Sequence, residues 1–343
     1  MPGDHQGLRG LALPDISPEE FDRVRLSEAD NQRIFLDEIV PFHLEGAAVQ
    51  SAPHLVVVGG ATGSGKSSVT DLVRYAFDRR GGALHINMDD FNPHHPDYTM
   101  LRRSAPEKAG ALLWSDGLSW WNKAQEYAHH PDRRNDVVIE SALRGSDEFE
   151  NILERFGEQG YRLNAALMGV PEAVSLQGGL HRYVAAMEKY GVGRYVEPEI
   201  HRECYEGVER AARAIDAGRP SGVGVVFFQR GGISNTPSGG MSAVERLAVE
   251  RGLPLGETQT GLFKATQEWM RSSIARNDAF STREKRKLLS EVDEIDRLAQ
   301  PLMVPSAAAL LVRGGARRPG PRGAVAPRAR GGPGVGPDRG IER

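Results

Sequence analysis

Apolar and polar positions over the first 230 residues follow a pattern in which strands alternate with helices. The run from His54 to Val58 is continuous, rich in β-branched residues and followed by glycines, which is typical of a strand buried on both faces of a parallel sheet. Further strands are predicted at residues 84–88, 136–140, 162–170 and 223–229. Helices are predicted at residues 66–79, 120–128, 149–159, 171–190 and 198–217. This alternation predicts an α/β fold with a mostly parallel sheet.

A helical segment precedes the first strand. Ser17 to Glu20 form a capping box with proline at the first helical position, which is a strong signal for a helix start. A second start follows at Ser27, and apolar residues then recur at helical spacing up to Val40. We therefore expect one domain over residues 17–230, with residues 1–16 disordered.

The pattern weakens beyond residue 231. Residues 242–251 and 261–299 are charged and compatible with helix but show few clear core positions, so residues 231–312 are interpreted as a partly helical, poorly defined extension. Residues 313–343 are dominated by Gly, Pro, Arg and Ala without periodicity. Such a tail buries too little apolar area to offset chain entropy and is expected to be disordered. A basic RNA-binding tail is the alternative, but the tail has no aromatic residue to stack on bases.

Composition narrows the function classes only slightly. A formal net charge of -3 argues against a chain that mainly binds nucleic acid. The single cysteine, Cys204, excludes an intramolecular disulfide and has no pattern around it that would activate a thiolate. Neither a signal-peptide pattern nor a long apolar run is seen, so we expect a cytoplasmic protein without a membrane span.

The most specific motif is a phosphate-binding loop. Residues 60–67 match the pattern G-x-x-x-x-G-K-[ST] in full, between a predicted strand and a predicted helix. Glycines let successive backbone N–H groups point inward, and the helix adds its positive N-terminal end. We expect Lys66 to reach the nucleotide phosphates and Ser67 to bind Mg²⁺. The nucleotide-binding residues predicted here are Gly60, Ala61, Thr62, Gly63, Ser64, Gly65, Lys66, Ser67 and Ser68.

Acidic residues lie at or just after the carboxyl ends of two other predicted strands. Asp89 lies just after the strand at residues 84–88, where a carboxylate would face the phosphate loop and accept a proton from an attacking hydroxyl. A simple capping role for Asp89 and Asp90 is the alternative. Glu140 ends the strand at residues 136–140 and is placed to bond a polar acceptor or a magnesium-bound water. Because no base-recognition tetrapeptide of the GTPases follows, a small-molecule kinase is the leading class.

Two arginines are candidates for a lid over the transferred phosphoryl group. Arg182 lies in LHRYV and Arg194 in GVGRYV. Arginine stabilises the charge that spreads over the phosphoryl oxygens in the transition state. Each of them, taken alone, is also compatible with an ordinary surface arginine. His94 and His95 lack further ligands at metal spacing and are interpreted as loop residues.

These motifs together resemble the zeta-toxin family, which are P-loop kinases of UDP-N-acetylglucosamine found as bacterial toxins and as stand-alone bacterial enzymes. The resemblance covers about residues 20–230 and is carried by GGATGSGKSS, INMDDFNPHHPDY, VVIES-x-x-R, VPEAVSLQGGLHRY and the spacing from Arg194 to His201. The lead-in NQRIFLDEIVPFHLEG is similar to that of actinobacterial members. The resemblance implies a three-layer α/β/α kinase fold that uses ATP and Mg²⁺.

Residue roles follow from the resemblance position by position. Asp89 matches the catalytic aspartate that takes the proton from the sugar 3′-hydroxyl. Lys66 matches the nucleotide lysine, and Arg182 and Arg194 match the two arginines that clamp phosphate. The resemblance also implies substrate contacts for three residues before, at the end of and after the strand at residues 136–140: Glu126, Glu140 and Arg144. In the toxins of the family, a small helical antitoxin blocks the ATP site.

One departure from the family pattern leaves the acceptor open. Ser141-Ala142 stands where members commonly have Gly-Thr, so one hydroxyl contact with the sugar is lost. The leading hypothesis remains phosphorylation of the 3′-hydroxyl of UDP-N-acetylglucosamine. The alternatives are a kinase for another hydroxyl compound, such as an antibiotic or a dinucleotide, and a nucleotide-binding module with little turnover. In the last case residues 17–47 would pack near the ATP site rather than serve as a scaffold.

Overall fold

The computed structural model of this chain describes residues 16–236 and 239–303. These residues belong to one compact unit. The predicted disordered tail at residues 313–343 lies outside the described residues, as do all but Ile16 of the predicted disordered start. The division of the chain at residue 230 stays a prediction.

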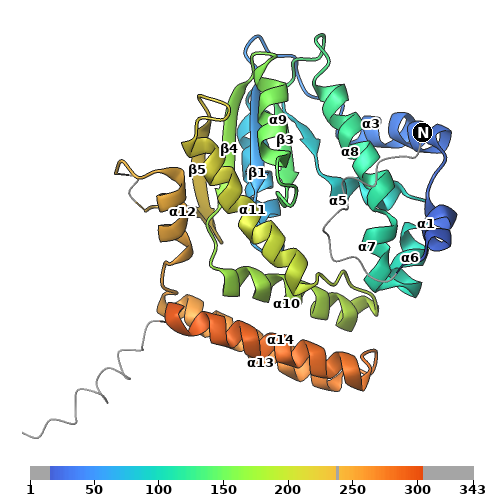
Figure 1. The fold of residues 1–343 in the computed structure, drawn as a ribbon, viewed down its shortest axis with the longest axis vertical. Coiled ribbons are helices and arrows are strands. Elements are labelled where there is room, and N and C mark those ends of the chain that lie inside the picture. The colour runs from blue at the N-terminus through green and yellow to red at the C-terminus, as the bar shows by residue number, and fades with distance from the viewer. Residues whose placement is uncertain (1–15, 237–238, 304–343) are drawn as a thin grey trace, which may run out of the picture. The chain divides into compact units, whose positions relative to one another are not determined.

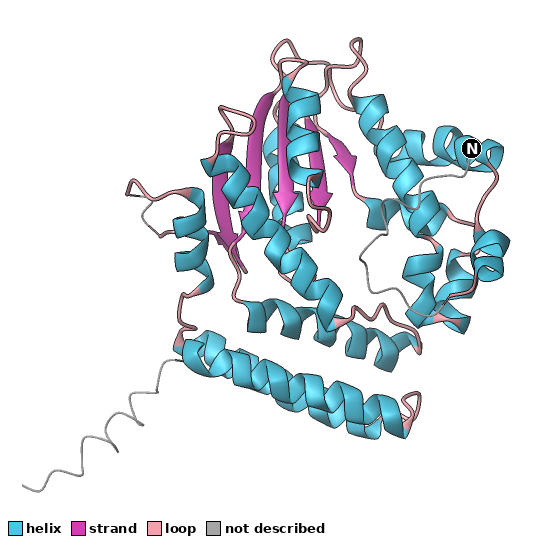
Figure 2. Cartoon of the chain, in the orientation of Figure 1, coloured by secondary structure: helices cyan, strands magenta, loops and turns pink. Residues whose placement is uncertain are grey.

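A six-stranded sheet forms the centre of this unit (Figures 1 and 2). Its strands are β1 (His54–Gly59), β2 (Leu84–Ile86), β3 (Val137–Ser141), β4 (Arg162–Met168), β5 (Gly224–Gln229) and β6 (Gly232–Ile233). They lie in the order β2-β3-β1-β4-β5-β6, and every pair is parallel except β5 with β6. The mostly parallel sheet is therefore confirmed, and the short antiparallel edge strand β6 is an addition to it.

Helices connect the strands and flank the sheet. Before β1 come α1 (Pro18–Val24), α2 (Glu28–Ile34), the π-helical turn η2 (Phe35–Ile39) and α3 (Val40–His43). Between strands lie α4 (Lys66–Asp78), α5 (Met88–Phe91), η3 (Asn92–His94), α6 (Tyr98–Ser104), α7 (Pro106–Leu112), α8 (Trp114–Ala128), α9 (Glu148–Gly157), α10 (Glu172–Tyr190) and α11 (Pro198–Asp216). After β6 follow α12 (Ala243–Arg251), α13 (Glu257–Arg276), α14 (Thr282–Ala299) and η4 (Gln300–Leu302).

The two faces of the sheet carry separate cores, because successive residues of a strand point to opposite faces. Leu55 and Val57 of β1 pack in a core with α2, α8, α9 and α11. Val58 packs in the other, with side chains from α4, α10, α13 and α14. Helices cover both faces, which gives the three-layer α/β/α arrangement and explains why β1 is apolar throughout.

The segment after β6 is more ordered than its sequence pattern indicated. Helices α13 and α14 form a hairpin that packs against α10 (Figure 1). Its buried side chains recur at intervals of three or four residues, and they include Phe263, Met270, Ile274, Leu288, Val292, Ile295 and Ala299. The prediction of few clear core positions at residues 261–299 was therefore wrong. High charge on the outer face of α14 concealed a regular apolar stripe.

The helices before β1 act as a scaffold for α8. The backbone N–H of Leu26 and the amide of Asn31 donate to Asp116 at 3.2 and 2.9 Å, and the Trp120 indole donates to the Asn31 carbonyl at 2.9 Å. No hydrogen bond or ion pair joins residues 17–47 to the phosphate loop within the described part of the chain. None of the helices formed by the described residues combines the length and apolar composition that crossing a membrane requires.

The connection after β2 holds helices that the sequence pattern did not predict. The strand ends at Ile86 rather than Met88, and α5, η3, α6 and α7 follow before α8. All four are seven residues or shorter, too short for a helical repeat of apolar positions to stand out. Asp89 consequently lies in the first turn of α5 and not on the strand itself.

Candidate active site

The phosphate loop lies where predicted, between β1 and α4. Gly63 and Gly65 have φ angles of +79° and +97°, in the region that favours glycine, and Gly65 is the N-cap of α4. A Cβ on Gly63 would lie 2.2 Å from the Ser175 carbonyl oxygen and 2.3 Å from the Gly179 backbone nitrogen. The tip of the loop therefore packs directly under α10, and glycine at residue 63 is required both by conformation and by space.

Lys66 opens α4 and folds back over the loop. Its ammonium donates to the carbonyl oxygens of Gly60 at 2.8 Å and Ala61 at 3.1 Å. Burial lowers the pKa of Lys66, while the negative charges of Glu140 and Asp89 act in the opposite direction. The lysine charge thus lies near the acidic residues Asp89, which follows β2, and Glu140, near the end of β3.

Glu140, on β3, reaches the start of α4. In the parallel register it pairs with Val58 of β1, so its side chain emerges beside the phosphate loop. The Ser67 hydroxyl donates to one carboxylate oxygen at 3.3 Å, and the Thr70 hydroxyl donates to the other at 2.7 Å. Glu140 is buried and lies next to the hydroxyl that the loop motif assigns to Mg²⁺. Whether Glu140 bonds a polar acceptor or a magnesium-bound water stays a prediction.

Asp89 and Arg194 form an ion pair across the site, between α5 and the loop that joins α10 to α11. The Asn87 side chain caps α5 by accepting from the Asp89 backbone N–H at 3.1 Å. Desolvation acts to raise the pKa of Asp89, but the charges of Arg194, Lys66 and Arg182 outweigh it and the pKa is lowered. Asp89 is thus ionised at neutral pH. Asn87, not Asp89, supplies the helix cap.

The charges of Arg194 and Asp89 also act on Arg182 and on a third arginine, Arg102. Partial desolvation lowers the pKa of Arg182, with Arg194 adding to the effect and Asp89 opposing it. Arg182 makes no ion pair with any residue that the structure describes. Burial also lowers the pKa of Arg102, on α6, with Tyr98 and Asp89 opposing the effect and Arg194 adding to it. Arg102 was missed because α6 was not predicted and its arginines follow no motif.

Ser141 has a structural role. Its hydroxyl accepts from the Leu143 backbone N–H at 2.9 Å and donates to Glu148, which also accepts from the Gly145 backbone N–H at 3.2 Å. These bonds fix the turn after β3, in which Leu143 has a φ of +55°. The hydroxyl is therefore engaged within the turn.

The other two predicted substrate residues are not brought to Asp89. Arg144 donates to Glu203 of α11 at 2.5 Å and is mostly buried there. Glu126 is exposed on α8 and has no hydrogen bond or ion pair with any described residue. Their roles in substrate binding remain predictions.

A further arginine contacts the phosphate loop. Arg230, directly after β5, donates to the Gly63 carbonyl at 2.5 Å, and a Cβ on Gly178 of α10 would collide with its guanidinium at 1.8 Å. The sequence offered one unused signal for Arg230, its place at the carboxyl end of a predicted strand, where ligands of open α/β sheets bind.

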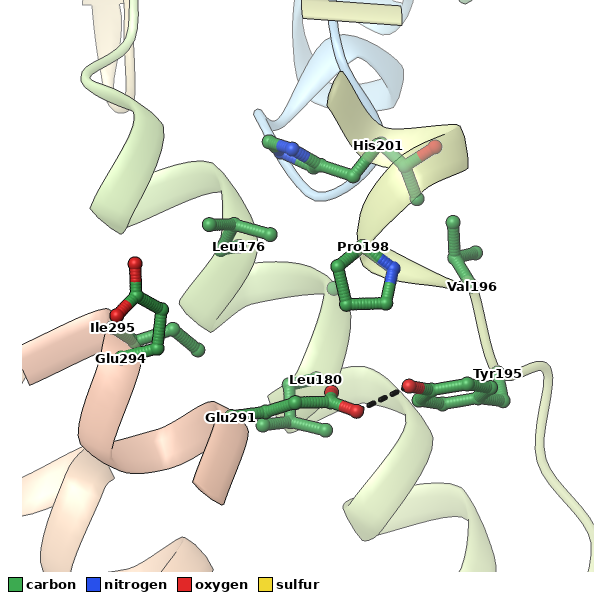
Figure 3. Close-up of a pocket in the computed structure, with 11 residues that line it drawn as sticks. Leu176, Leu180, Tyr195, Val196, Pro198, His201, Glu291, Glu294 and Ile295 are labelled. Atoms are coloured by element: carbon green, nitrogen blue, oxygen red, sulfur yellow. Dashed lines mark hydrogen bonds between the residues drawn. The ribbon is translucent and has the colours of Figure 1, made fainter. Parts of the chain in front are cut away.

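A cavity of about 70 Å³ lies beside the loop, between α10, the start of α11 and α14 (Figure 3). Its walls are mainly apolar, from Leu180, Val196 and Ile295, and Thr62 of the phosphate loop also lines it. At one end the Tyr195 hydroxyl donates to Glu291 (Figure 3).

His94 and His95 have partners other than a metal. His94 bonds His43 at 3.1 Å and Glu38 at 3.2 Å, and His95 is buried 3.6 Å from Asp116. Within residues 16–236 and 239–303, no three His, Cys, Asp or Glu side chains are grouped so as to hold a metal ion. Cys204 is buried, and burial raises the pKa of its thiol, which does not favour a reactive thiolate.

One solved structure supports the fold. A structure from the PezAT chromosomal toxin–antitoxin system of Streptococcus pneumoniae aligns with a TM-score of 0.60 at 14% identity, over 74% of this chain and 98% of that one. A complex of AvrRxo1-ORF1 and ORF2 with ATP aligns with a TM-score of 0.43 at 12% identity, over 84% of this chain and 96% of that one. No curated protein matches the sequence.

A family model supplies the assignment. The model described as zeta toxin matches residues 44–236, which contain the phosphate loop, Asp89, Glu140 and both predicted lid arginines. The match covers more than half of the chain and ends just after β6, before the α13–α14 hairpin. This chain is therefore a member of the zeta toxin family with a P-loop kinase-like fold.

Proposed function

We propose that this protein is an ATP-dependent kinase that phosphorylates the 3′-hydroxyl of the N-acetylglucosamine unit of UDP-N-acetylglucosamine. The observation that carries the proposal is the convergence of Asp89, Lys66 and Arg194. An ionised carboxylate, the phosphate-loop lysine and an arginine of the α10–α11 loop act on one another at the carboxyl edge of the sheet. A phosphoryl donor and a hydroxyl acceptor would meet at that edge.

The phosphate loop and Lys66 bind the nucleotide. The backbone N–H groups of the loop and the N-terminus of α4 form a site for anions. In the nucleotide complex we expect the Lys66 ammonium to exchange its bonds with Gly60 and Ala61 for phosphate oxygens. Such an exchange replaces neutral acceptors by charged ones, which bind an ammonium more strongly.

Asp89 acts as the base toward the sugar hydroxyl. Its lowered pKa keeps it ionised at neutral pH, so that it can accept a proton, but its ion pair with Arg194 makes it a weak base. We infer that Arg194 turns from Asp89 to the phosphoryl group when both substrates are bound. That exchange would free the carboxylate and place the arginine on the charge that develops during transfer.

The residues beside Ser67 fit a magnesium ion. Ser67 and Glu140 present a hydroxyl and a carboxylate, and hard oxygen donors of this kind, together with water and phosphate, are the ligands that Mg²⁺ takes in kinases. Bound there, Mg²⁺ would neutralise phosphate charge. Thr70 holds Glu140 from the other side at 2.7 Å and so keeps its carboxylate directed at the site.

The acceptor is proposed from family membership. Zeta-toxin relatives phosphorylate UDP-N-acetylglucosamine, and depletion of that cell-wall precursor accounts for their toxicity. Arg144 and Glu126 are retained as candidate sugar contacts, although Arg144 would have to exchange its bond with Glu203. We further propose a small helical antitoxin as partner, since the PezAT structure belongs to a toxin–antitoxin system.

An acceptor panel tests the proposal. Purified full-length protein is incubated with γ-labelled ATP, Mg²⁺ and either UDP-N-acetylglucosamine, an antibiotic with free hydroxyls, or a dinucleotide. We expect label in the sugar nucleotide at its 3′-oxygen, and none when Lys66→Ala replaces the wild type. Label found only in another compound would mean that this compound, and not UDP-N-acetylglucosamine, is the acceptor. Binding of ATP without transfer to any of them would favour the nucleotide-binding module.

A further inference from the structure

The loop that joins α10 to α11 has two sides with different partners. Arg194 contacts Asp89 of α5, whereas the next residue, Tyr195, contacts α14. The hydroxyl of Tyr195 donates to Glu291, as Figure 3 shows. One dipeptide thus connects the proposed base with a helix outside the part of the chain that the zeta-toxin model matches.

A second contact holds the same loop. Lys287, one turn before Glu291 on α14, donates to both carboxylate oxygens of Glu197 at 2.9 and 2.8 Å. Its ammonium also lies 4.6 Å from the centre of the Tyr195 ring. α14 therefore contacts the loop on both sides of Val196. Lys287 forms a salt bridge with Glu197, and Tyr195 packs against Lys287 and donates a hydrogen bond to Glu291.

The hairpin itself is firmly anchored. Ile274 of α13 and Val292 of α14 are fully buried in the core that contains α10. The Gln177 amide of α10 donates to the Phe263 carbonyl of α13 at 2.8 Å. A loop bound to such a hairpin is held by a rigid element rather than by a flexible one.

We propose that the α13–α14 hairpin positions Arg194 for phosphoryl transfer, with Tyr195 and Glu291 as the positioning residues. The inference rests on the proposed kinase function. Tyr195 fixes the backbone from which Arg194 extends, and Glu291 fixes Tyr195. Neither contacts the reacting atoms in this account, since both act through Arg194. The apolar cavity walls around them, Leu180, Val196 and Ile295, shield the bond from water and so strengthen it.

The electrostatics of Glu291 agree with this role. Burial raises the pKa of Glu291 to about 7, with hydrogen bonding from Tyr195 and the charge of Lys287 opposing the rise and Glu197 and Glu199 adding to it. A carboxyl group with this pKa can accept from Tyr195 in either protonation state, because one oxygen always remains an acceptor.

A double-mutant cycle tests the proposal in the full chain. Because a displacement of about 1 Å at a catalytic group costs roughly a hundredfold in rate, we expect Tyr195→Phe to lower kcat for phosphoryl transfer by about tenfold or more. In the Arg194→Ala background the same change should alter kcat by less than about twofold, since a residue that acts through Arg194 has nothing left to position. An equal loss in both backgrounds, or no loss in either, would overturn the proposal.

Two further variants separate positioning from general stability. Glu291→Gln keeps a carbonyl acceptor for Tyr195 and should retain activity, whereas Glu291→Ala should match Tyr195→Phe. The control is Asp293→Asn, a change on the same helix as Glu291 that weakens an ion pair with Arg271 of α13 and does not touch the loop. A loss in Asp293→Asn as large as that in Glu291→Ala would show a merely structural effect and overturn the proposal.

Hydrogen exchange of residues 191–197 gives a readout that needs no acceptor. We expect faster exchange there in Tyr195→Phe and Glu291→Ala, and wild-type exchange in Asp293→Asn. If the wild type transfers phosphate to no acceptor, the proposed function fails by itself. Unchanged exchange in Tyr195→Phe would instead refute the positioning role.

Discussion

Arg194 forms an ion pair with Asp89, so the proposed lid and the proposed base contact each other directly. The two residues come from elements far apart in the sequence, the α10–α11 loop and the first turn of α5. While they are paired, the carboxylate is held ionised and its basicity is reduced. If Arg194 leaves Asp89 to bind phosphate, binding of the phosphoryl donor frees the carboxylate that activates the acceptor.

Removal of Arg194 is predicted to shift the pH dependence of the reaction. Its charge is the largest influence lowering the pKa of Asp89, so Arg194→Ala should raise that pKa toward or above its ordinary value. Since the base must be ionised, the acidic limb of the kcat/KM profile should move to higher pH. The control is Arg202→Ala, an exposed arginine of α11 that does not contact Asp89. An acidic limb at the same pH in Arg194→Ala and wild type would contradict the pairing.

Glu140→Gln is predicted to weaken the response to magnesium. The change removes the negative charge beside Ser67 and replaces the two carboxylate oxygens, which accept from Ser67 and Thr70, by one carbonyl oxygen and one NH₂ group. We expect the Mg²⁺ concentration at half-maximal activity to rise by about tenfold, in the range that neighbours of metal ligands contribute. Thr70→Val is the milder comparison and should give a smaller shift. A normal magnesium response together with a raised KM for the sugar nucleotide would instead assign Glu140 to the acceptor.

Gly63→Ala is predicted to abolish nucleotide binding. A Cβ at this position meets backbone atoms of α10 at 2.2 and 2.3 Å, and the φ of +79° disfavours alanine in any case. Gly179→Ala is a matched control, because a Cβ there has its nearest atoms, both of Thr62, at 4.0 Å. Calorimetric titration with ATP measures both variants. Full affinity in Gly63→Ala would show that the loop tip separates from α10 without cost.

Met270→Ala is predicted to destabilise the whole compact unit. Met270 is fully buried in the core shared by α10 and the hairpin, and truncation of such a side chain costs about 2–5 kcal/mol. Urea denaturation should show a single transition at lower midpoint, followed by both circular dichroism and tryptophan fluorescence. Leu262→Ala, on an exposed position of α13, should change little. Separate transitions from the two probes would indicate that the hairpin unfolds on its own.

The sequence predicted the strand and loop features of this fold well, because they depend on local pattern. A continuous β-branched run followed by a glycine-rich loop has few alternative structures, and β1 and α4 lie where that pattern places them. The apolar stripe of α14, at Leu288, Val292, Ile295 and Ala299, was not predicted, because the charged residues of its outer face concealed the helical repeat. The short helices α5 to α7 had no comparable signal.

The sequence predicted where some residues of the candidate site lie, but not which contacts they make. The motifs placed Lys66, Asp89 and Glu140 at one edge of the sheet, which parallel topology requires. Two contacts depend on how elements far apart in the sequence pack: the ion pair of Arg194 with Asp89, and the hydrogen bond of Tyr195 with a glutamate of α14. No spacing rule within one element contains that information, and Arg102 and Arg230 were missed for the same reason.

Product formation by Asp89→Asn shows whether Asp89 serves as the base for phosphorylation of UDP-N-acetylglucosamine. The matched control is Asp90→Asn, since Asp90 lies 3.3 Å from His85 and has no contact with Arg194. Loss of a catalytic base costs about 10²–10⁴-fold in rate, so we predict a loss of this size in Asp89→Asn, with ATP affinity retained and Asp90→Asn active. Undiminished product from Asp89→Asn would mean that Asp89 is not the base.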